Sequence, residues 1–187
     1  MSSVRSGQAL EFRDATLEDV PALERLIAVS ARGLACPDYT SEQIEAALGT
    51  AWGVDSQLIR DGTYFVVEDQ GKPVACGGWS RRGTPFGGDH FSDRDAVLLD
   101  PTRDAARIRA FFVLPEWARR GVGRQMLKHC EKAASAAGFF TLELVATLAG
   151  HRLYRGCGYE GDSRVRYDLP GGLGIDFIPM RKRLQQG

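Results

Sequence analysis

Apolar residues along the chain alternate between a spacing typical of helices and a spacing typical of strands. Apolar positions three and four residues apart predict helices over 16–32, 41–48, 122–137 and 150–156. Short apolar runs predict strands at 9–13, 108–114, 139–145, 159–169 and 175–183. The stretch 63–80 predicts two further strands around a turn at Asp69, Gln70 and Gly71. Helices and strands in this order predict an α/β domain, with a mixed sheet and helices on its faces.

The clearest signal is a buried strand followed by an amphipathic helix. The strand at 108–114, I-R-A-F-F-V-L, is almost continuously apolar, as strands covered on both faces are. The helix carries charged residues on one side, and its apolar face consists of Val122, Met126, Leu127, Cys130, Ala133, Ala134 and Ala137. Gly138 is expected to end this helix, because glycine is favoured just after helix C-termini.

Length and composition limit the class of protein. The 187 residues fit a single domain, 1–187, whose first eight residues are expected to form a flexible tail. Lys plus Arg and Asp plus Glu number 24 each, so we expect neither a nucleic acid nor a membrane as partner. No apolar run approaches the roughly 20 residues of a membrane helix, and a cytoplasmic location is expected. The four cysteines are isolated and no histidine lies at metal-ligand spacing, so no metal is expected.

The segment between this strand and this helix has the features of an anion site. Free N–H groups and the positive end of the helix dipole meet at a helix N-terminus. Gly121 and Gly123 leave the backbone accessible, while Arg119, Arg120 and Arg124 add charge that suits phosphate. A glycine-containing turn with solvated arginines is the alternative, because short glycine motifs are often false positives. No P-loop motif, G-x-x-x-x-G-K-[ST], is present.

The same segment resembles the acetyl-CoA-binding core of the GNAT acyltransferases. P-E-W-A-R-R-G-V-G-R-Q-M-L matches the family signature [Q/R]-x-x-G-x-[G/A] at Gly121 and Gly123, but has Ala118 at the first position. The segment L-Y-R-G-C-G-Y at 153–159 resembles the family's [FL]-Y-x-x-x-G-[FY]. The resemblance implies a mostly antiparallel central sheet of about six to seven strands flanked by helices. It also implies acetyl-CoA as the acyl donor.

The resemblance further indicates which residues would bind the donor. The strand at Phe111, Phe112 and Val113 would splay from the strand at 142–145, and the pantetheine arm would pair with backbone groups in the opening. Backbone N–H groups near Phe112 or Val113 would polarise the thioester carbonyl. The pyrophosphate would be held by the segment Arg119, Arg120, Gly121, Val122, Gly123 and Arg124.

Transfer to an amine by direct attack in a ternary complex needs a neutral nucleophile and a stabilised leaving thiolate. Tyr154 matches the family's frequent general acid near the sulfur, although its ring could simply pack. Glu143 is the leading candidate for the base, because alternation directs it away from Leu142 and Leu144. A half-exposed strand charge and a water chain are the alternatives for Glu143. His151, one helical turn before Tyr154, fits a surface position better.

The acceptor is expected to be a primary amine of a small molecule or peptide. Candidate contacts are the aromatic and charged residues Tyr39, Trp52, Asp55, Trp79, Arg81 and Arg82, with His90 in the long loop at 81–104. A catalytically silent CoA-binding sensor or regulatory module with the same fold is the rival interpretation, supported by the departure at Ala118. A homodimer is left open.

Overall fold

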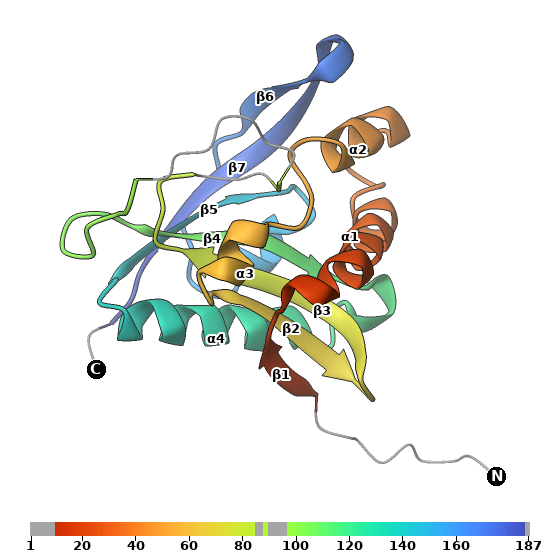
Figure 1. Cartoon of the computed structure of the whole chain (residues 1–187). Coiled ribbons are helices and arrows are strands. Elements are labelled where there is room, and N and C mark those ends of the chain that lie inside the picture. Colours follow the sequence, from red (N-terminus) through yellow and green to blue (C-terminus); the bar gives the residue numbers. More distant parts are fainter. Residues whose placement is uncertain (1–9, 85–87, 90–96, 186–187) are drawn as a thin grey trace.

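The central sheet fixes the layout of the molecule. The structure is a computed structural model that describes residues 10–84, 88–89 and 97–185, so the expected tail at 1–8 and His90 lie outside the described residues. The sheet has the order β1-β2-β3-β4-β5-β7-β6 (Figure 1). Its strands are β1 (Glu11–Asp14), β2 (Tyr64–Asp69), β3 (Lys72–Ser80), β4 (Ala106–Val113), β5 (Thr141–Ala146), β6 (Val165–Leu169) and β7 (Leu173–Arg183). Every neighbouring pair is antiparallel except β4 and β5. The prediction of a mixed, mostly antiparallel sheet is therefore confirmed.

Helices cover both faces of this sheet. They are α1 (Val20–Leu34), α2 (Ser41–Leu48), α3 (Ser56–Arg60), α4 (Val122–Ala136) and α5 (His151–Arg155). The inward face of α1 packs on Val66 and Cys76, whereas α4 packs on Val67 and Ala75. Because successive strand residues point to opposite faces, α1 and α4 lie on opposite sides of the sheet. The helix α3 was not predicted, since five residues are too few to show a helical period.

The strands β4 and β5 separate soon after they meet. Their register holds two pairs, Ala106 with Leu142 and Arg107 with Glu143. Beyond these pairs β4 stays with β3 as far as the pair Val113 and Ala75. The register between β3 and β4 shifts in mid-strand, and Ala110 there has a φ of 51°. A bulge of this kind bends a strand, so β4 follows β3 and turns away from β5. The splay predicted between these two strands is confirmed.

A glycine of β3 lies under an aromatic ring of β4 at this bend. A Cβ atom on Gly77 would overlap the Cδ2 atom of Phe111 and lie 2.9 Å from its Cε2 atom. The ring of Phe111 therefore rests directly on the β3 backbone. This contact fixes how far the ring can withdraw from the opening between β4 and β5.

Membrane-spanning helices and metal-binding groups are both absent from the described residues. Within 10–84, 88–89 and 97–185, no helix is long and apolar enough to cross a membrane. In the same ranges, no group of three or more His, Cys, Asp or Glu side chains could hold a metal ion.

Candidate active site

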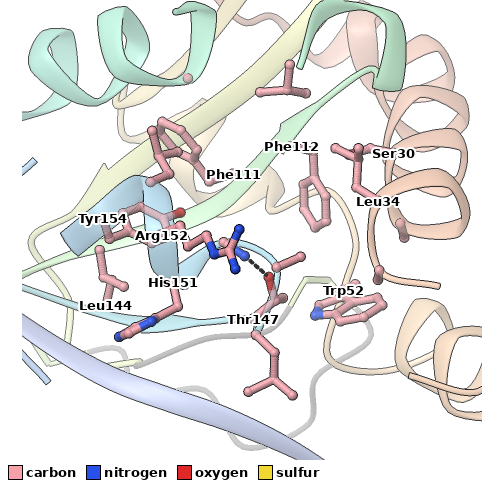
Figure 2. Close-up of a pocket in the computed structure, with 18 of the residues that line it drawn as sticks. Ser30, Leu34, Trp52, Phe111, Phe112, Leu144, Thr147, His151, Arg152 and Tyr154 are labelled. Atoms are coloured by element: carbon pink, nitrogen blue, oxygen red, sulfur yellow. Dashed lines mark hydrogen bonds between the residues drawn. The ribbon is translucent and has the colours of Figure 1, made fainter. Parts of the chain in front are cut away.

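A cleft of about 1000 Å³ occupies the opening between β4 and β5 (Figure 2). Phe111 and Phe112 both line it. Phe111 packs in the apolar clusters on the α4 side of the sheet, and Phe112 packs in those on the side of α1 and α2. The cleft therefore passes between the strands and connects the two faces of the sheet. One ligand can enter from each face and meet the other in the middle.

The N-terminus of α4 forms one end of the cleft. Gly121 is the N-cap, with a φ of 84° and no side chain to bond the first turn of the helix. Arg119 also has a positive φ, 61°, and Arg120 between these two residues does not. A loop in which φ changes sign at successive residues can present its N–H groups on one side, where they bind anions. Arg119, Gly121, Gly123 and Arg124 all line the cleft.

Two residues of the predicted pyrophosphate segment have other surroundings. The Arg120 guanidinium lies over the Trp117 ring, 5.2 Å from its centroid. Val122 is 1% exposed and belongs to the core under α4, so its side chain does not line the cleft. Arg152 of α5 does line it and is exposed. Sequence reasoning missed Arg152, although it directly precedes the second motif and stands two residues before Tyr154.

The hydrogen bonding of β4 shows which N–H groups face the opening. The N–H of Leu114 donates to the carbonyl of Val74 on β3 at 2.9 Å. Successive N–H groups along an antiparallel strand point to alternate sides. The N–H of Phe112 therefore points to β3, and that of Val113 points into the opening. Of the two N–H groups considered for the thioester carbonyl, the one at Val113 has the required direction.

Tyr154 lines one side of the cleft, and its hydroxyl points toward the interior (Figure 2). The residue is 8% exposed, and its ring makes edge contacts with Phe111 at 6.1 Å and Tyr159 at 5.9 Å between centroids. Among the described residues the hydroxyl has no hydrogen-bond partner, so it is available to a ligand. Burial raises the pKa of Tyr154 above its ordinary value. The phenol therefore stays protonated at neutral pH and can act as a donor.

Glu143 does not share this cleft with Tyr154. Its carboxylate pairs with Arg107, and with Arg181 at 3.5 Å. It lines a separate cavity of about 360 Å³ together with these two arginines and Tyr167. Alternation correctly separated Glu143 from Leu142 and Leu144. The cleft, however, begins one residue further along β5, where Leu144 and Val145 line it.

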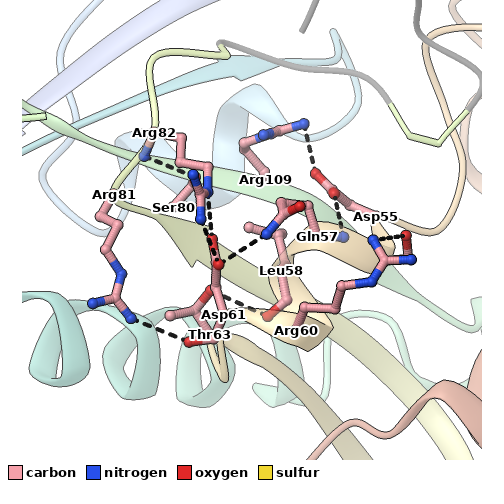
Figure 3. A network of polar contacts seen from close by, with 11 residues as sticks. Asp55, Gln57, Leu58, Arg60, Asp61, Thr63, Ser80, Arg81, Arg82 and Arg109 are labelled. Carbon is pink, nitrogen blue, oxygen red and sulfur yellow. Dashed lines mark hydrogen bonds and ion pairs between the residues drawn. The ribbon is translucent and has the colours of Figure 1, made fainter. Parts of the chain in front are cut away.

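The other charged candidates are held by ion pairs and hydrogen bonds in a polar network (Figure 3). Asp55 caps α3 and pairs with Arg109 at 2.6 Å, and both side chains are buried. Arg82 pairs with Asp61 at 2.7 Å, and Arg81 donates to the carbonyl of Asp61. Of these residues, Arg109 alone is a lining residue of the cleft.

The remaining candidates divide between the core and the cleft wall. Trp79 is buried in the core on the α4 side. The hydroxyl of Tyr39 donates to the carbonyl of Asp176 at 2.7 Å and accepts from the N–H of Leu148 at 2.9 Å. Burial raises the pKa of Tyr39 to about 12. Trp52 lines the cleft, and so does His151, whose Nε2 atom lies 2.9 Å from the Gly161 carbonyl oxygen.

Comparison with known proteins defines the class of this chain. The family model of the GNAT acetyltransferase domain matches residues 60–161, more than half of the sequence. The chain therefore belongs to the GNAT acetyltransferases, and the predicted class of enzyme is confirmed. A search of curated proteins found no match to the chain.

Solved structures share the whole fold. A GCN5-related N-acetyltransferase from Rhodopseudomonas palustris is 23% identical, with a TM-score of 0.69 over 98% of this chain and 100% of that one. The PaiA N-acetyltransferase from Thermoplasma acidophilum, solved with coenzyme A, is 15% identical with a TM-score of 0.64 over 94% and 99%. The ribosomal-protein-alanine N-acetyltransferase from Brucella melitensis is 20% identical with a TM-score of 0.61 over 93% and 99%. At these identities the likeness concerns the fold.

Proposed function

We propose that this protein transfers the acetyl group of acetyl-CoA to a primary amine by direct attack in a ternary complex. The observation that carries the proposal is the cleft that runs from the α4 N-terminus, between β4 and β5, to the face of α1 and α2. A donor entering from one face and an acceptor from the other can meet beside Tyr154. No covalent enzyme intermediate is then required.

The donor end suits a pyrophosphate and a pantetheine arm. Arg119, Arg124 and Arg152 supply charge around the uncapped N-terminus of α4, and arginine binds phosphate with paired hydrogen bonds. The free edge of β4 offers backbone groups with which the amides of pantetheine can pair. The N–H of Val113 then lies on the side where the thioester carbonyl develops negative charge.

Tyr154 would stabilise the leaving sulfur. The amine nitrogen forms a bond to the carbonyl carbon, the carbon–sulfur bond breaks, and the amine gives up one proton. A phenol ordinarily has a pKa of about 10, against about 8.5 for a thiol. Burial raises the pKa of Tyr154 further, so this residue serves as a hydrogen-bond donor to the thiolate and is not depleted by ionisation.

The proton of the amine would leave through water. The leading candidate for a base, Glu143, is engaged by Arg107 and Arg181 outside the cleft. Among the described lining residues, Asp38 carries the one carboxylate, and it lies in the loop after α1. We therefore expect turnover to rise with pH as the acceptor amine itself becomes neutral. Glu143→Gln is expected to retain turnover, which pH–rate profiles of the two proteins would check.

Two measurements test the proposal. Acetyl-CoA should raise the thermal midpoint of the purified protein, whereas ATP and adenosine diphosphate should have smaller effects. Release of the CoA thiol with an amine panel then measures turnover. Tyr154→Phe is expected to lower kcat by about a hundredfold with unchanged affinity for acetyl-CoA. Binding without turnover for any amine would instead identify a silent CoA-binding module.

A further inference from the structure

The half of the cleft on the side of α1 and α2 has an aromatic wall. We call the five lining residues Leu34, Trp52, Phe112, Leu148 and Phe177 the acceptor wall. The rings of Trp52 and Phe177 are 6.3 Å apart between centroids, and Phe112 packs in the same apolar cluster. Figure 2 shows Trp52, Phe112 and Leu34 together, across the cleft from Tyr154. The rings of Trp52 and Phe177 contact each other, so a flat apolar group would pack against the surface that they present to the cleft, where offset and edge contacts between rings are favourable.

Two polar groups on this half of the cleft can only donate hydrogen bonds. Trp52 offers an indole N–H, which has no hydrogen-bond partner among the described residues. Arg164 is exposed, lines the cleft, and makes no ion pair within the described chain. It directly precedes Val165, the register partner of Phe177, so it stands at the rim of the acceptor wall. Indole and guanidinium groups donate and cannot accept, so they suit a carboxylate.

These features disfavour a polycationic acceptor. Such a ligand needs several carboxylates, and Asp38 is the one carboxylate among the lining residues that the structure describes. The arginines that line the cleft, Arg109, Arg119, Arg124, Arg152 and Arg164, would repel it. Arg109 is neutralised by Asp55, but the remaining four leave the cleft with an excess of positive charge.

We propose that the acceptor is an aromatic amino acid, whose ring packs on the acceptor wall, whose carboxylate meets Arg164, and whose α-amino group reaches the middle of the cleft. This inference rests on the proposed acetyl transfer and deepens it by naming the acceptor. Free amino acids and the N-terminal residue of a peptide share the ring and the amine. The free amino acid also carries an α-carboxylate, which the N-terminal residue of a peptide lacks.

The test compares four acceptors at saturating acetyl-CoA by thiol release: L-phenylalanine, L-phenylalaninamide, L-alanine and spermidine. L-Phenylalanine should exceed L-alanine in kcat/KM by at least roughly tenfold, from burial of the ring. Spermidine should be the poorest acceptor. A preference for spermidine, or equal use of alanine and phenylalanine, would overturn the proposal.

Two variants isolate the carboxylate contact. Arg164→Gln should lower kcat/KM for L-phenylalanine by roughly tenfold through KM, and should leave L-phenylalaninamide unchanged. Arg166→Gln, at an exposed arginine of β6 that lies two residues further along the chain and does not line the cleft, is the matched control and should affect neither acceptor. Equal losses for both acceptors in Arg164→Gln would refute the role of Arg164. If no acceptor releases thiol, the acceptor class is refuted, and the thermal shift with acetyl-CoA in the same samples reports separately on the donor end.

Discussion

The contact between Gly77 and the ring of Phe111 leads to a quantitative prediction for Gly77→Ala. The new methyl group would overlap one ring atom and lie 2.9 Å from another. Carbon atoms at rest are about 3.5–4.0 Å apart, so the ring must withdraw by roughly 1 Å. The Phe111 ring lines the cleft, where it contacts Tyr154 at 6.1 Å between centroids. The displacement therefore goes into the cleft.

Two opposing effects set the expected loss of stability. Overpacking a core position costs about 1–3 kcal/mol. Replacing glycine by alanine returns about 0.4–1 kcal/mol, because the unfolded chain loses conformational freedom. The net loss is about 1–2 kcal/mol, which for a chain of this length lowers the thermal midpoint by about 2–8 °C. Affinity for acetyl-CoA should fall as well, because the ring narrows the opening.

Thermal unfolding by circular dichroism and acetyl-CoA titration by calorimetry measure these two effects. Gly49→Ala is the matched control, because Gly49 ends α2 with a φ of −80° and a Cβ atom there would lie 3.6 Å from its nearest neighbour. The control should be at least as stable as the parent. If Gly77→Ala unfolds at the parent's temperature and binds acetyl-CoA equally well, then Gly77 does not set the position of the Phe111 ring.

Three further predictions concern charged and titrating groups. Arg13, through its hydrogen bonds, holds the pKa of Asp19 at about 2 in the folded protein. Asp19→Asn should therefore lower the free energy of unfolding by about 1 kcal/mol above pH 4, allowing for solvent screening. Urea titrations of the two proteins should show this difference vanish as the pH falls through about 2. Asp55→Ala should lower the free energy of unfolding, measured in urea, by about 3–5 kcal/mol, because Arg109 is left buried without its carboxylate partner. Adding Arg109→Met to this variant should recover much of the lost free energy. The pH–rate profile should show no loss of activity from ionisation of Tyr154 up to about pH 10, since burial raises its pKa; a falling limb that Tyr154→Phe abolishes would contradict this.

Periodicity predicted the helices and strands that have a strong apolar face. The helix expected at 122–137 is α4 (Val122–Ala136), and Gly138 follows it with a φ of 91°. The strand expected at 108–114 is β4 (Ala106–Val113). These elements were predictable because burial selects apolar residues at a fixed spacing. The boundaries of β6 were less accurate, since 159–164 do not belong to that strand although Tyr159 is buried.

The candidate site was predicted only in part, because its shape depends on pairing between distant segments. Ala110 has a positive φ, unlike ordinary strand residues. The sequence does not predict this conformation, since alanine has no preference for a positive φ. Glu143 shows the same limit. The alternation of side chains along a strand predicts the face of the sheet to which Glu143 points. Whether Glu143 lines the cleft or forms an ion pair there depends on the position at which β4 separates from β5. Trp52 lines the cleft because of the tertiary arrangement of a loop.

The short pairing between β4 and β5 also has a mechanical consequence. It divides the sheet into two plates, β1–β4 and β5–β7, joined edge to edge over two residue pairs. The ion pair of Arg107 with Glu143 stands at this joint. A small rotation of one plate against the other about the joint would change the gap most at its far end, near Val113. We therefore expect the thickness of a molecule bound in the gap to set the angle between the two plates. That angle in turn sets the width of the cleft on the side of α1 and α2.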